Sequence, residues 1–314
     1  MEKEKTFAGF PSCVDLAQLQ SDIAIIGIPY GTPYAPEKPP HSLYAPNAIR
    51  RESNRYKDDP VAWDFDLGGT LLGDFSVRAV DCGDLPGSQD DPEGNRERTQ
   101  EVVTSILAKN AVPIVLGGDD SVPIPVMCAY VGGEPFHVLQ LDAHIDWRDS
   151  VGGVREGYSS TMRRASELDS VVGIVQAGMR GVGSARAEEH RAAVNYGVEI
   201  VLAKTLMREG TEAVLQHLPE GERCFLTIDF DVLDPSVMPA VGASAPGGLN
   251  FQTLIDIIHG AAVRTKIVGV CLVEFAPEAD LHNLSAVTAM RIVWNVIGAL
   301  ARDRDISKQA SSVS

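Results

Sequence analysis

Eight short apolar runs, separated by longer amphipathic stretches, constrain the fold of this chain more than any other feature. Several runs are continuously hydrophobic rather than alternating, which is typical of strands that are buried on both faces of a parallel sheet. The strands are predicted at residues 23–28, 77–80, 112–116, 137–141, 173–177, 198–203, 224–230 and 267–275. The helices are predicted at residues 95–109, 184–195, 211–218, 251–263 and 285–302.

This alternation predicts an α/β fold with three layers, α/β/α, built around a mostly parallel sheet of about eight strands. The alternative is a closed barrel, but a barrel needs evenly spaced units, whereas this chain makes a long excursion near its N-terminus. We expect a single domain over residues 1–314, with an N-terminal extension at 1–22 and a flexible tail at 304–314. Residues 30–47 and 146–158 are expected to form long loops.

The composition limits the partners of the chain. The sequence has 43 acidic and 27 basic residues and a formal net charge of −16. This balance argues against nucleic acid and anionic membrane, because both repel an acidic surface. The five cysteines include no CxxC pair, which is usual in a reducing compartment. No signal peptide is evident, and no run approaches the ~20 apolar residues of a membrane span. We therefore expect a soluble, cytoplasmic protein.

Acidic side chains gather where several of the predicted strands end. In an open parallel sheet, ligands bind just beyond the carboxyl ends of the strands. Residues i and i+2 of an extended segment point the same way, so neighbouring members of each set are expected to converge. The residues at these positions are Asp119 and Asp120 after the third run, Asp142, His144 and Asp146 after the fourth, Asp229 and Asp231 at the end of the seventh, and Glu274 at the end of the eighth.

Such a carboxylate cluster calls for bound cations. Without them, the close packing of so many acids would force large pKa shifts or disorder. The segment from Asp229 to Asp234 lacks the glycine and the final glutamate of an EF-hand loop, so it is not a calcium loop of that kind. One imidazole among carboxylates favours Mn²⁺, with Ni²⁺ or Co²⁺ as alternatives, over calcium or structural zinc. The sequence therefore predicts two divalent metal ions in a hydrolytic site.

Several motifs give the chain a resemblance to a known family. They occur in order from about residue 23 to residue 302, and they are Ala-Pro-Asn-Ala-Ile-Arg at 45–50, Gly-Gly-Asp-Asp-Ser at 117–121, Asp-Ala-His-Ile-Asp at 142–146, Asp-Phe-Asp-Val-Leu-Asp-Pro at 229–235 and Val-Glu-Phe at 273–275. With these motifs the chain resembles the ureohydrolase family of arginase and agmatinase, on the agmatinase-like side of that family.

The resemblance implies an arginase-like fold and a defined division of labour. Asp142 and Asp229 would bridge two metals; Asp146 would complete one metal site, and His144 and Asp231 the other. A hydroxide held between the metals would attack the guanidinium carbon, while Glu274 would hold the guanidinium by charge-assisted hydrogen bonds. The products would be urea, or a urea derivative, and an amine. The family also implies homo-oligomers, either trimers or hexamers.

Two positions depart from the family pattern. The family has a metal-binding histidine where this chain has Asp120, and we count Asp120 among the metal ligands. In the alternative, Asp120 turns away and that metal site lacks one ligand. The family also has a His-Gly pair after the fourth strand, whose histidine is a proton shuttle. The nearest match here is Glu156-Gly157, so Glu156 is a candidate proton relay, with a solvated loop residue as the alternative. The predicted catalytic residues are thus Glu274, Glu156 and Asp146.

The substrate tail is less constrained. Trp147 is predicted to stack on a guanidino group or an alkyl tail, unless it belongs to the core. Arg148, and with it Arg155 and Arg163, could bind a carboxylate at the far end of a substrate, which would disfavour the ammonium group of agmatine. Agmatine is the default by resemblance; guanidino acids, guanidine, and substituted guanidines or biguanides are alternatives.

Two readings of other kinds compete with the ureohydrolase. One is a catalytically impaired subunit, altered at Asp120 and Glu156, that assembles with an active paralogue as a hetero-oligomer. The otherwise complete set of metal-binding residues argues against it. The other is a deacetylase on the same general fold, which would use one zinc and fewer acidic ligands. The pair Asp229 and Asp231 disfavours it.

Overall fold

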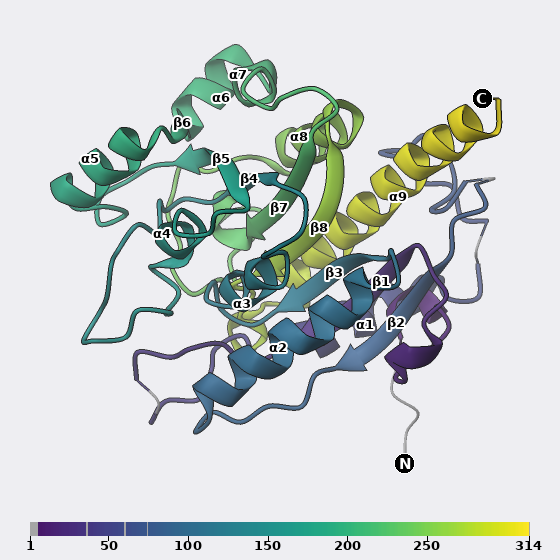
Figure 1. Cartoon of the computed structure of the whole chain (residues 1–314), viewed down its shortest axis with the longest axis horizontal. Coiled ribbons are helices and arrows are strands. Elements are labelled where there is room, and N and C mark those ends of the chain that lie inside the picture. Colours follow the sequence, from purple (N-terminus) through teal and green to yellow (C-terminus); the bar gives the residue numbers. More distant parts are fainter. Residues whose placement is uncertain (1–5, 36, 60, 74, 314) are drawn as a thin grey trace.

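All eight predicted strands are present and form one parallel sheet (Figure 1). The structure is a computed structural model that describes residues 6–35, 37–59, 61–73 and 75–313, with side chains through residue 303. The strand order is β2-β1-β3-β8-β7-β4-β5-β6, and every pairing is parallel. The sheet is open rather than a closed barrel. The strands are β1 Ile23–Ile28, β2 Ala79–Asp84, β3 Val112–Gly117, β4 Phe136–Leu141, β5 Val171–Met179, β6 Glu199–Leu202, β7 Arg223–Asp229 and β8 Lys266–Val273.

Helices cover both faces of the sheet, as the predicted three-layer fold requires. The α-helices are α1 Ala45–Ser53, α2 Pro92–Leu107, α3 Pro123–Cys128, α4 Thr161–Ala165, α5 Ala187–Tyr196, α6 Ala203–Glu209, α7 Glu212–Leu215, α8 Phe251–Arg264 and α9 Leu284–Val313. The 3-10 helices are η1 Phe7–Gly9, η2 Leu16–Gln18, η3 Asn54–Tyr56, η4 Phe230–Val232 and η5 Pro277–Ala279. One hydrophobic core contains side chains of α1, α6, α7, α8 and α9, and the other contains side chains of α2, α3, α4 and α5.

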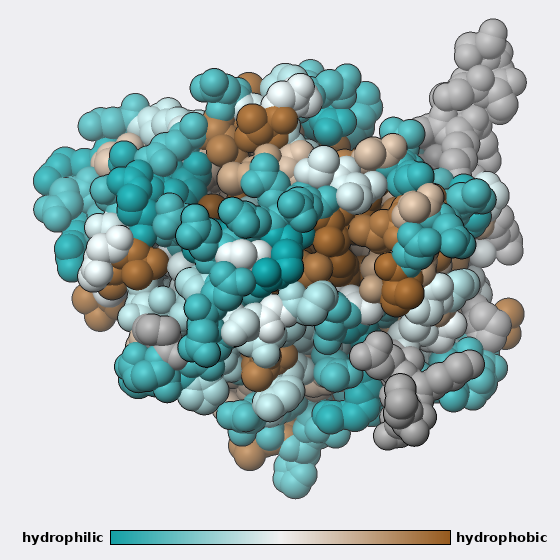
Figure 2. All heavy atoms as spheres, turned by 60° about the horizontal axis from the view of Figure 1, so that its bottom comes forward, coloured by the Kyte–Doolittle hydropathy of each residue, from teal (hydrophilic) through white to brown (hydrophobic). Residues whose placement is uncertain are grey.

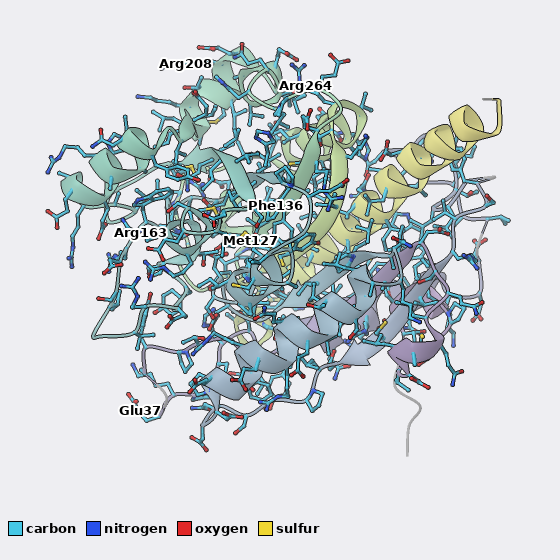
Figure 3. The ribbon with its side chains drawn as sticks, in the orientation of Figure 1. Glu37, Met127, Phe136, Arg163, Arg208 and Arg264 are labelled. Atoms are coloured by element: carbon cyan, nitrogen blue, oxygen red, sulfur yellow. The ribbon has the colours of Figure 1, made fainter. Side chains whose placement is uncertain are left out.

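The continuous hydrophobic runs are explained by these two cores. In β1, Ile23 and Ile25 contribute to the first core, whereas Ala24, Ile26 and Ile28 contribute to the second. Successive side chains of a strand point to opposite faces, so a strand covered on both faces needs apolar residues at every position. Within the second core, Met127 and Phe136 have no exposed surface and lie in the middle of the molecule (Figure 3). The outer surface in Figure 2 is mostly hydrophilic, with separate apolar patches.

Helix α9 is longer and more apolar than the sequence analysis anticipated. Its segment Leu284–Asp303 is long and apolar enough to cross a membrane, although no such run was expected. However, 83% of its most apolar window is buried inside the protein, as in the core helix of an α/β domain. The helix continues to Val313, through most of the expected tail at 304–314, and extends beyond the sheet in Figure 1. Residue 314 lies outside the described residues.

The sheet order positions the functional site. The strands β3, β8, β7 and β4 are direct neighbours at the centre of the sheet, although they are far apart in the sequence. Their carboxyl ends therefore meet at one edge, and ligands of open α/β sheets bind where the strand order reverses in this way. These are the same four strands that carry the predicted acidic residues.

Candidate metal centre

Each of the four central strands delivers an acidic residue to the same edge of the sheet. Asp142 directly follows β4, Asp229 is the last residue of β7, and Glu274 directly follows β8. Asp120 comes three residues after β3, through a turn at Gly118. All four side chains are buried, with at most 6% of the residue exposed. The sequence prediction that these carboxylates share one edge is confirmed.

Short backbone turns, rather than extended chain, bring the ligand atoms together. The Asp229 carboxylate accepts a hydrogen bond of 2.7 Å from the Asp231 amide and so begins η4. The His144 amide donates to Asp142 at 2.6 Å, and the Ala143 amide donates to Asp231 at 3.0 Å. Aspartate commonly forms such bonds with the backbone two residues ahead. We expected residues i and i+2 of an extended strand to point the same way, and this explanation is wrong. The side chains do converge, but backbone turns bring them together.

The candidate ligands form two groups that share one aspartate. Asp142, His144 and Asp231 place one potential ligand atom each within 4.8 Å of one another, and so do Asp120, Asp142 and Asp229. Asp146 lies outside both groups but remains close. The Gln140 side chain donates to Asp142 at 2.7 Å and to Asp146 at 2.8 Å. The arrangement suits two cations on either side of Asp142.

Asp120 provides the clearest test of whether a cation fits. Both of its carboxylate oxygens are buried, and neither has a partner with hydrogen-bond geometry within the described part of the chain. The Thr161 hydroxyl, which donates to the Asp120 backbone oxygen, and the Asp146 carboxyl lie close enough to influence the pKa of Asp120. A buried carboxylate without a partner is costly, and native proteins pair such charges or coordinate metals with them. The residues present therefore fit a divalent cation at Asp120, as hard oxygen ligands do for Mn²⁺.

The electrostatics point in the same direction. Burial raises the pKa values of Asp120, Asp142 and Asp229 well above their usual range, and the charges of neighbouring carboxylates raise them further. Burial also raises the pKa of Asp146. Burial lowers the pKa of His144, but its hydrogen bond to Asp231 and the charge of that residue outweigh burial, so the pKa is raised. Cations would remove the mutual repulsion of these acids.

The backbone is strained at two positions of the site. Asp146 and Glu274 have φ values of 43° and 71°, in the left-handed region that side chains other than glycine seldom adopt. Such residues persist only where their surroundings hold them, and they concentrate at functional sites. Gly178 has a φ of 109°, and a β-carbon there would lie 2.6 Å from the carbonyl oxygen of Asp142. This close approach of two chain segments requires glycine.

A pocket of about 390 Å³ lies over these groups. Its lining includes Asp120, His144, Asp146, Asp229, Asp231 and Glu274, and also His41, Arg148, Tyr158 and Ser184. A larger cavity of about 560 Å³ lies where β3, β7 and β8 begin, and its lining contains none of these candidate ligands. We take the smaller pocket as the candidate active site because candidate metal ligands and Glu274 line it.

Three predicted site residues are absent from the lining of this pocket: Asp142, Trp147 and Glu156. Asp142 is fully buried, but it belongs to both ligand groups. Trp147 is 3% exposed and belongs to the second hydrophobic core, with its ring centroid 5.7 Å from that of Tyr196. Its alternative assignment as a core residue is therefore the correct one. Glu156 is half-buried on the loop after β4 and is also absent from the lining. Although Glu156-Gly157 matches the position of the family's His-Gly pair, the Glu156 side chain does not line the pocket.

Sequence reasoning missed His41. Its Nε2 lies 2.7 Å from Oε2 of Glu274, and its side chain is 39% exposed. The hydrogen bond with Glu274 raises the pKa of His41, and burial opposes this effect. His41 comes from the proline-rich loop before α1, far from every metal-binding motif. A lone histidine in a loop carries no sequence signal that would have placed it here.

Comparison with known proteins identifies the family of this site. The model of the arginase family matches residues 21–298. The chain belongs to the arginase family. It is 30% identical to agmatinase from Pyrococcus horikoshii over 286 residues, covering 90% of this chain and 93% of the relative. It is 29% identical to formimidoylglutamase from Halalkalibacterium halodurans, covering 85% of each chain.

The solved structures agree with this assignment. Proclavaminate amidino hydrolase from Streptomyces clavuligerus has the same fold, with a TM-score of 0.80 and 25% identity, covering 95% of this chain and 97% of that one. The family members named here differ in substrate, so membership establishes an arginase-family hydrolase without choosing among substrates.

Proposed function

We propose that this protein is a metal-dependent hydrolase that cleaves a C–N bond of a guanidino compound, releasing urea or a urea derivative and an amine. The observation that carries the proposal is the buried Asp120 carboxylate, which has no hydrogen-bond partner among the described residues and belongs to one of two ligand groups that share Asp142. Glu274 lies in the same pocket and offers a carboxylate to a cationic substrate. A metal cluster and a guanidinium acceptor are the two parts that this reaction needs.

The metals would be held by carboxylates and one imidazole. The proposed ligands are Asp120, Asp142, His144, Asp146, Asp229 and Asp231. When bound, divalent ions lower the pKa of coordinated water and so supply a nucleophile at neutral pH. We propose Mn²⁺ as the metal, with Ni²⁺ as the alternative, because hard oxygen ligands predominate. Gln140 would keep Asp142 and Asp146 oriented, as outer partners of metal ligands do.

Glu274 would bind and orient the substrate. A guanidinium ion is planar and can donate two parallel N–H bonds to one carboxylate. Glu274 lies among the metal-binding carboxylates at the same sheet edge, so this contact would direct the guanidinium carbon towards the cluster. Holding a reactant in this way contributes to the rate by replacing a random encounter with a fixed geometry.

The substrate tail divides two candidate functions. Resemblance favours agmatine, whose tail ends in an ammonium group. Arg148 favours a guanidino acid instead, because it is the arginine in the lining of the pocket, and its ion pair with Glu189 is long, at 3.8 Å. Arg155 and Arg163 are occupied by Asp149 and Glu167, and neither lines the pocket. A cation near the substrate's far end would repel the agmatine ammonium.

The assembly of the protein is a separate proposal. We propose a homo-oligomer, a trimer or a hexamer, by analogy with the family. An impaired subunit that needs an active paralogue is the competing proposal, and the buried ligand set around Asp142 argues for an active chain. Light scattering of the purified chain measures its oligomeric state. A turnover assay on the same sample shows whether the chain is active without a paralogue.

The deciding experiment combines metal content with product release. The purified chain is loaded with Mn²⁺ or Ni²⁺, its metals are counted, and urea and amine are measured with agmatine, guanidino acids, guanidine and biguanides. Two metals per chain with turnover support the proposal. At most one metal with no turnover on any substrate contradicts it. The Arg148→Ala variant should lose its preference for guanidino acids, whereas Arg163→Ala, a matched control, should retain it.

A further inference from the structure

Both carboxylate oxygens of Glu274 are already held by the protein. Oε1 accepts a hydrogen bond of 2.8 Å from the backbone amide of Asp120. Oε2 lies 2.7 Å from Nε2 of His41. The two donors come from distant parts of the chain, one after β3 and the other from the loop before α1. Glu274 is therefore fixed from two sides before any substrate arrives.

The backbone of Gly242 closes a third side of this pair. A β-carbon at Gly242 would lie 2.5 Å from Oε2 of Glu274 and 2.9 Å from Nε2 of His41. Real β-carbons do not approach so closely, so any side chain at this position would push the pair apart. Gly242 thus limits the contact between His41 and Glu274 on one side, while the His41 side chain remains 39% exposed.

The remaining capacity of Glu274 matches a guanidinium ion. Each carboxylate oxygen can accept about two hydrogen bonds. His41 and the Asp120 amide use one site on each oxygen, which leaves one site on each for a substrate. Two parallel N–H groups of a guanidinium would fill those sites. A glutamate that was free to rotate would lose side-chain entropy on binding, whereas a fixed one would not.

We propose that His41 is a positioning residue: with the Asp120 amide, it holds the Glu274 carboxylate in the orientation that accepts the guanidinium group. This inference rests on the proposed function for the role of Glu274. It also makes the loop between β1 and α1 part of the substrate site. The affinity for guanidinium should then depend on a residue that comes from outside all the metal-binding motifs.

The test measures binding of guanidinium chloride, at millimolar concentration, to the full-length protein loaded with Mn²⁺. Isothermal titration is carried out on the wild type and on His41→Ala, His41→Gln and His259→Gln, with the metal content of each. Glutamine is the conservative variant, because its side-chain amide nitrogen can donate at nearly the reach of Nε2. His259→Gln is the matched control, because His259 has its own hydrogen bond to Asn295, on the face of the sheet covered by α8 and α9.

The expected result is a loss and a rescue. His41→Ala should weaken guanidinium binding by about tenfold, the size expected for one hydrogen bond to a charged group. His41→Gln should recover most of the affinity, His259→Gln should match the wild type, and all four proteins should bind the same amount of metal. A collapse of the fold would lower the metal content, so unchanged metal separates positioning from instability.

Three outcomes would overturn the inference. They are wild-type affinity in His41→Ala, no rescue in His41→Gln, and no guanidinium binding by the metal-loaded wild type. Failure of the proposed function has a different signature. If no guanidino compound is hydrolysed but the binding series shows the loss and rescue, the hydrolase proposal falls and the role of His41 stands.

Discussion

Two buried acidic clusters in this protein solve the same electrostatic problem in opposite ways. At the edge strand β2, Asp81 has no exposed surface, and Arg50 donates to its two oxygens at 2.8 and 2.9 Å. Arg50 also donates to Asp84. At the centre of the sheet, Asp120 and Asp142 are also buried. Gln140 donates to Asp142, whereas no donor among the described residues has hydrogen-bond geometry to the Asp120 oxygens.

The difference separates a structural cluster from a functional one. Burial alone lowers the pKa of Arg50, yet the charges of Asp81 and Asp84 outweigh it and raise the pKa. The cluster at β2 thus contains its own cation and needs nothing from solution. The candidate metal ligands of the central cluster are several carboxylates and a single imidazole, so we expect their cation to come from solution. Burial of acids by itself does not indicate a metal site, whereas burial without a partner does.

The largest expected effect tests the shared ligand of the central cluster. Asp142→Ala should lower metal affinity by at least about 100-fold, because even outer partners of metal ligands contribute 10- to 100-fold. Urea release should fall below detection. Metal analysis after dialysis, together with product assays, measures both effects. The control is Asp149→Ala, an exposed acid nearby that pairs with Arg155 and Arg164. Full metal content in Asp142→Ala would remove Asp142 from the ligand set.

The cluster at β2 should respond through stability instead. Asp81→Asn leaves the Arg50 charge buried with a weaker partner, and breaking a buried pair in this way costs about 3–5 kcal/mol. The folded fraction should still bind its full metal complement. Urea unfolding compares it with Glu134→Gln, which breaks an exposed pair with Arg223 and should cost less than about 1 kcal/mol. Equal costs for the two variants would contradict the assignment of Asp81 as a structural residue.

A change at Asp120 should have the opposite sign. In metal-free protein at alkaline pH, where Asp120 is ionised despite its raised pKa, Asp120→Asn removes a buried charge and should stabilise the fold by about 1–3 kcal/mol. In protein saturated with Mn²⁺, the same change removes a ligand, so the stability gained from the metal should shrink. Unfolding curves with and without metal provide the comparison. Destabilisation of the metal-free protein would mean that Asp120 has a protein partner after all.

The smallest effect concerns Asp234, which belongs to the motif at residues 229–235 but lies outside both clusters. Bonds from Ser236 and from the Gly247 amide lower the pKa of Asp234 to about 2. A lowered pKa stabilises the fold above the unfolded value of about 3.9, and this contribution disappears as the pH falls through about 2. Asp234→Asn should therefore cost less than about 1 kcal/mol at pH 6, since solvent screens the group. Unfolding curves at pH 6 and pH 3 check this, and a cost that grows at pH 3 would reverse the predicted sign.

The buried strands were the most predictable part of the fold. The run at 23–28 has the same bounds as β1, because a strand covered on both faces leaves an uninterrupted apolar signal. Strand β2 was placed at 77–80 instead of Ala79–Asp84. Its second half contains Asp81 and Asp84, whose partner Arg50 comes from a different segment, so the polar residues concealed this half-buried edge strand.

The shorter helices α1, α3, α4 and α6 were missed. Helix α1 begins within the region expected to be a loop, and α3 contains Pro123 and Pro125. Proline is tolerated in the first turn of a helix, so a proline-rich segment can still start one. Helices α3, α4 and α6 have at most seven residues, too few for a clear helical period.

The candidate site was predictable where its residues follow strands directly. The segments at the ends of β4 and β7 could be recognised because they place carboxylates where apolar runs end. His41 could not be found in this way, because its contact with Glu274 depends on how a long loop folds back across the sheet edge. Trp147 shows the converse limit. Its place next to Asp146 suggested a binding role. However, the chain has a left-handed turn at Asp146, and the Trp147 side chain that follows is buried in the second core.

The position of β8 has a consequence for how the protein is made. This strand is the last of the eight in the chain, yet it pairs with β3 on one side and β7 on the other. Until the ribosome has released it, the growing chain holds two half-sheets whose inner edges are unpaired and prone to association. Such long-range pairing slows folding. Strand β8, which Glu274 directly follows, therefore joins the two halves of the sheet. The active site cannot assemble during synthesis before the C-terminal quarter of the chain has emerged.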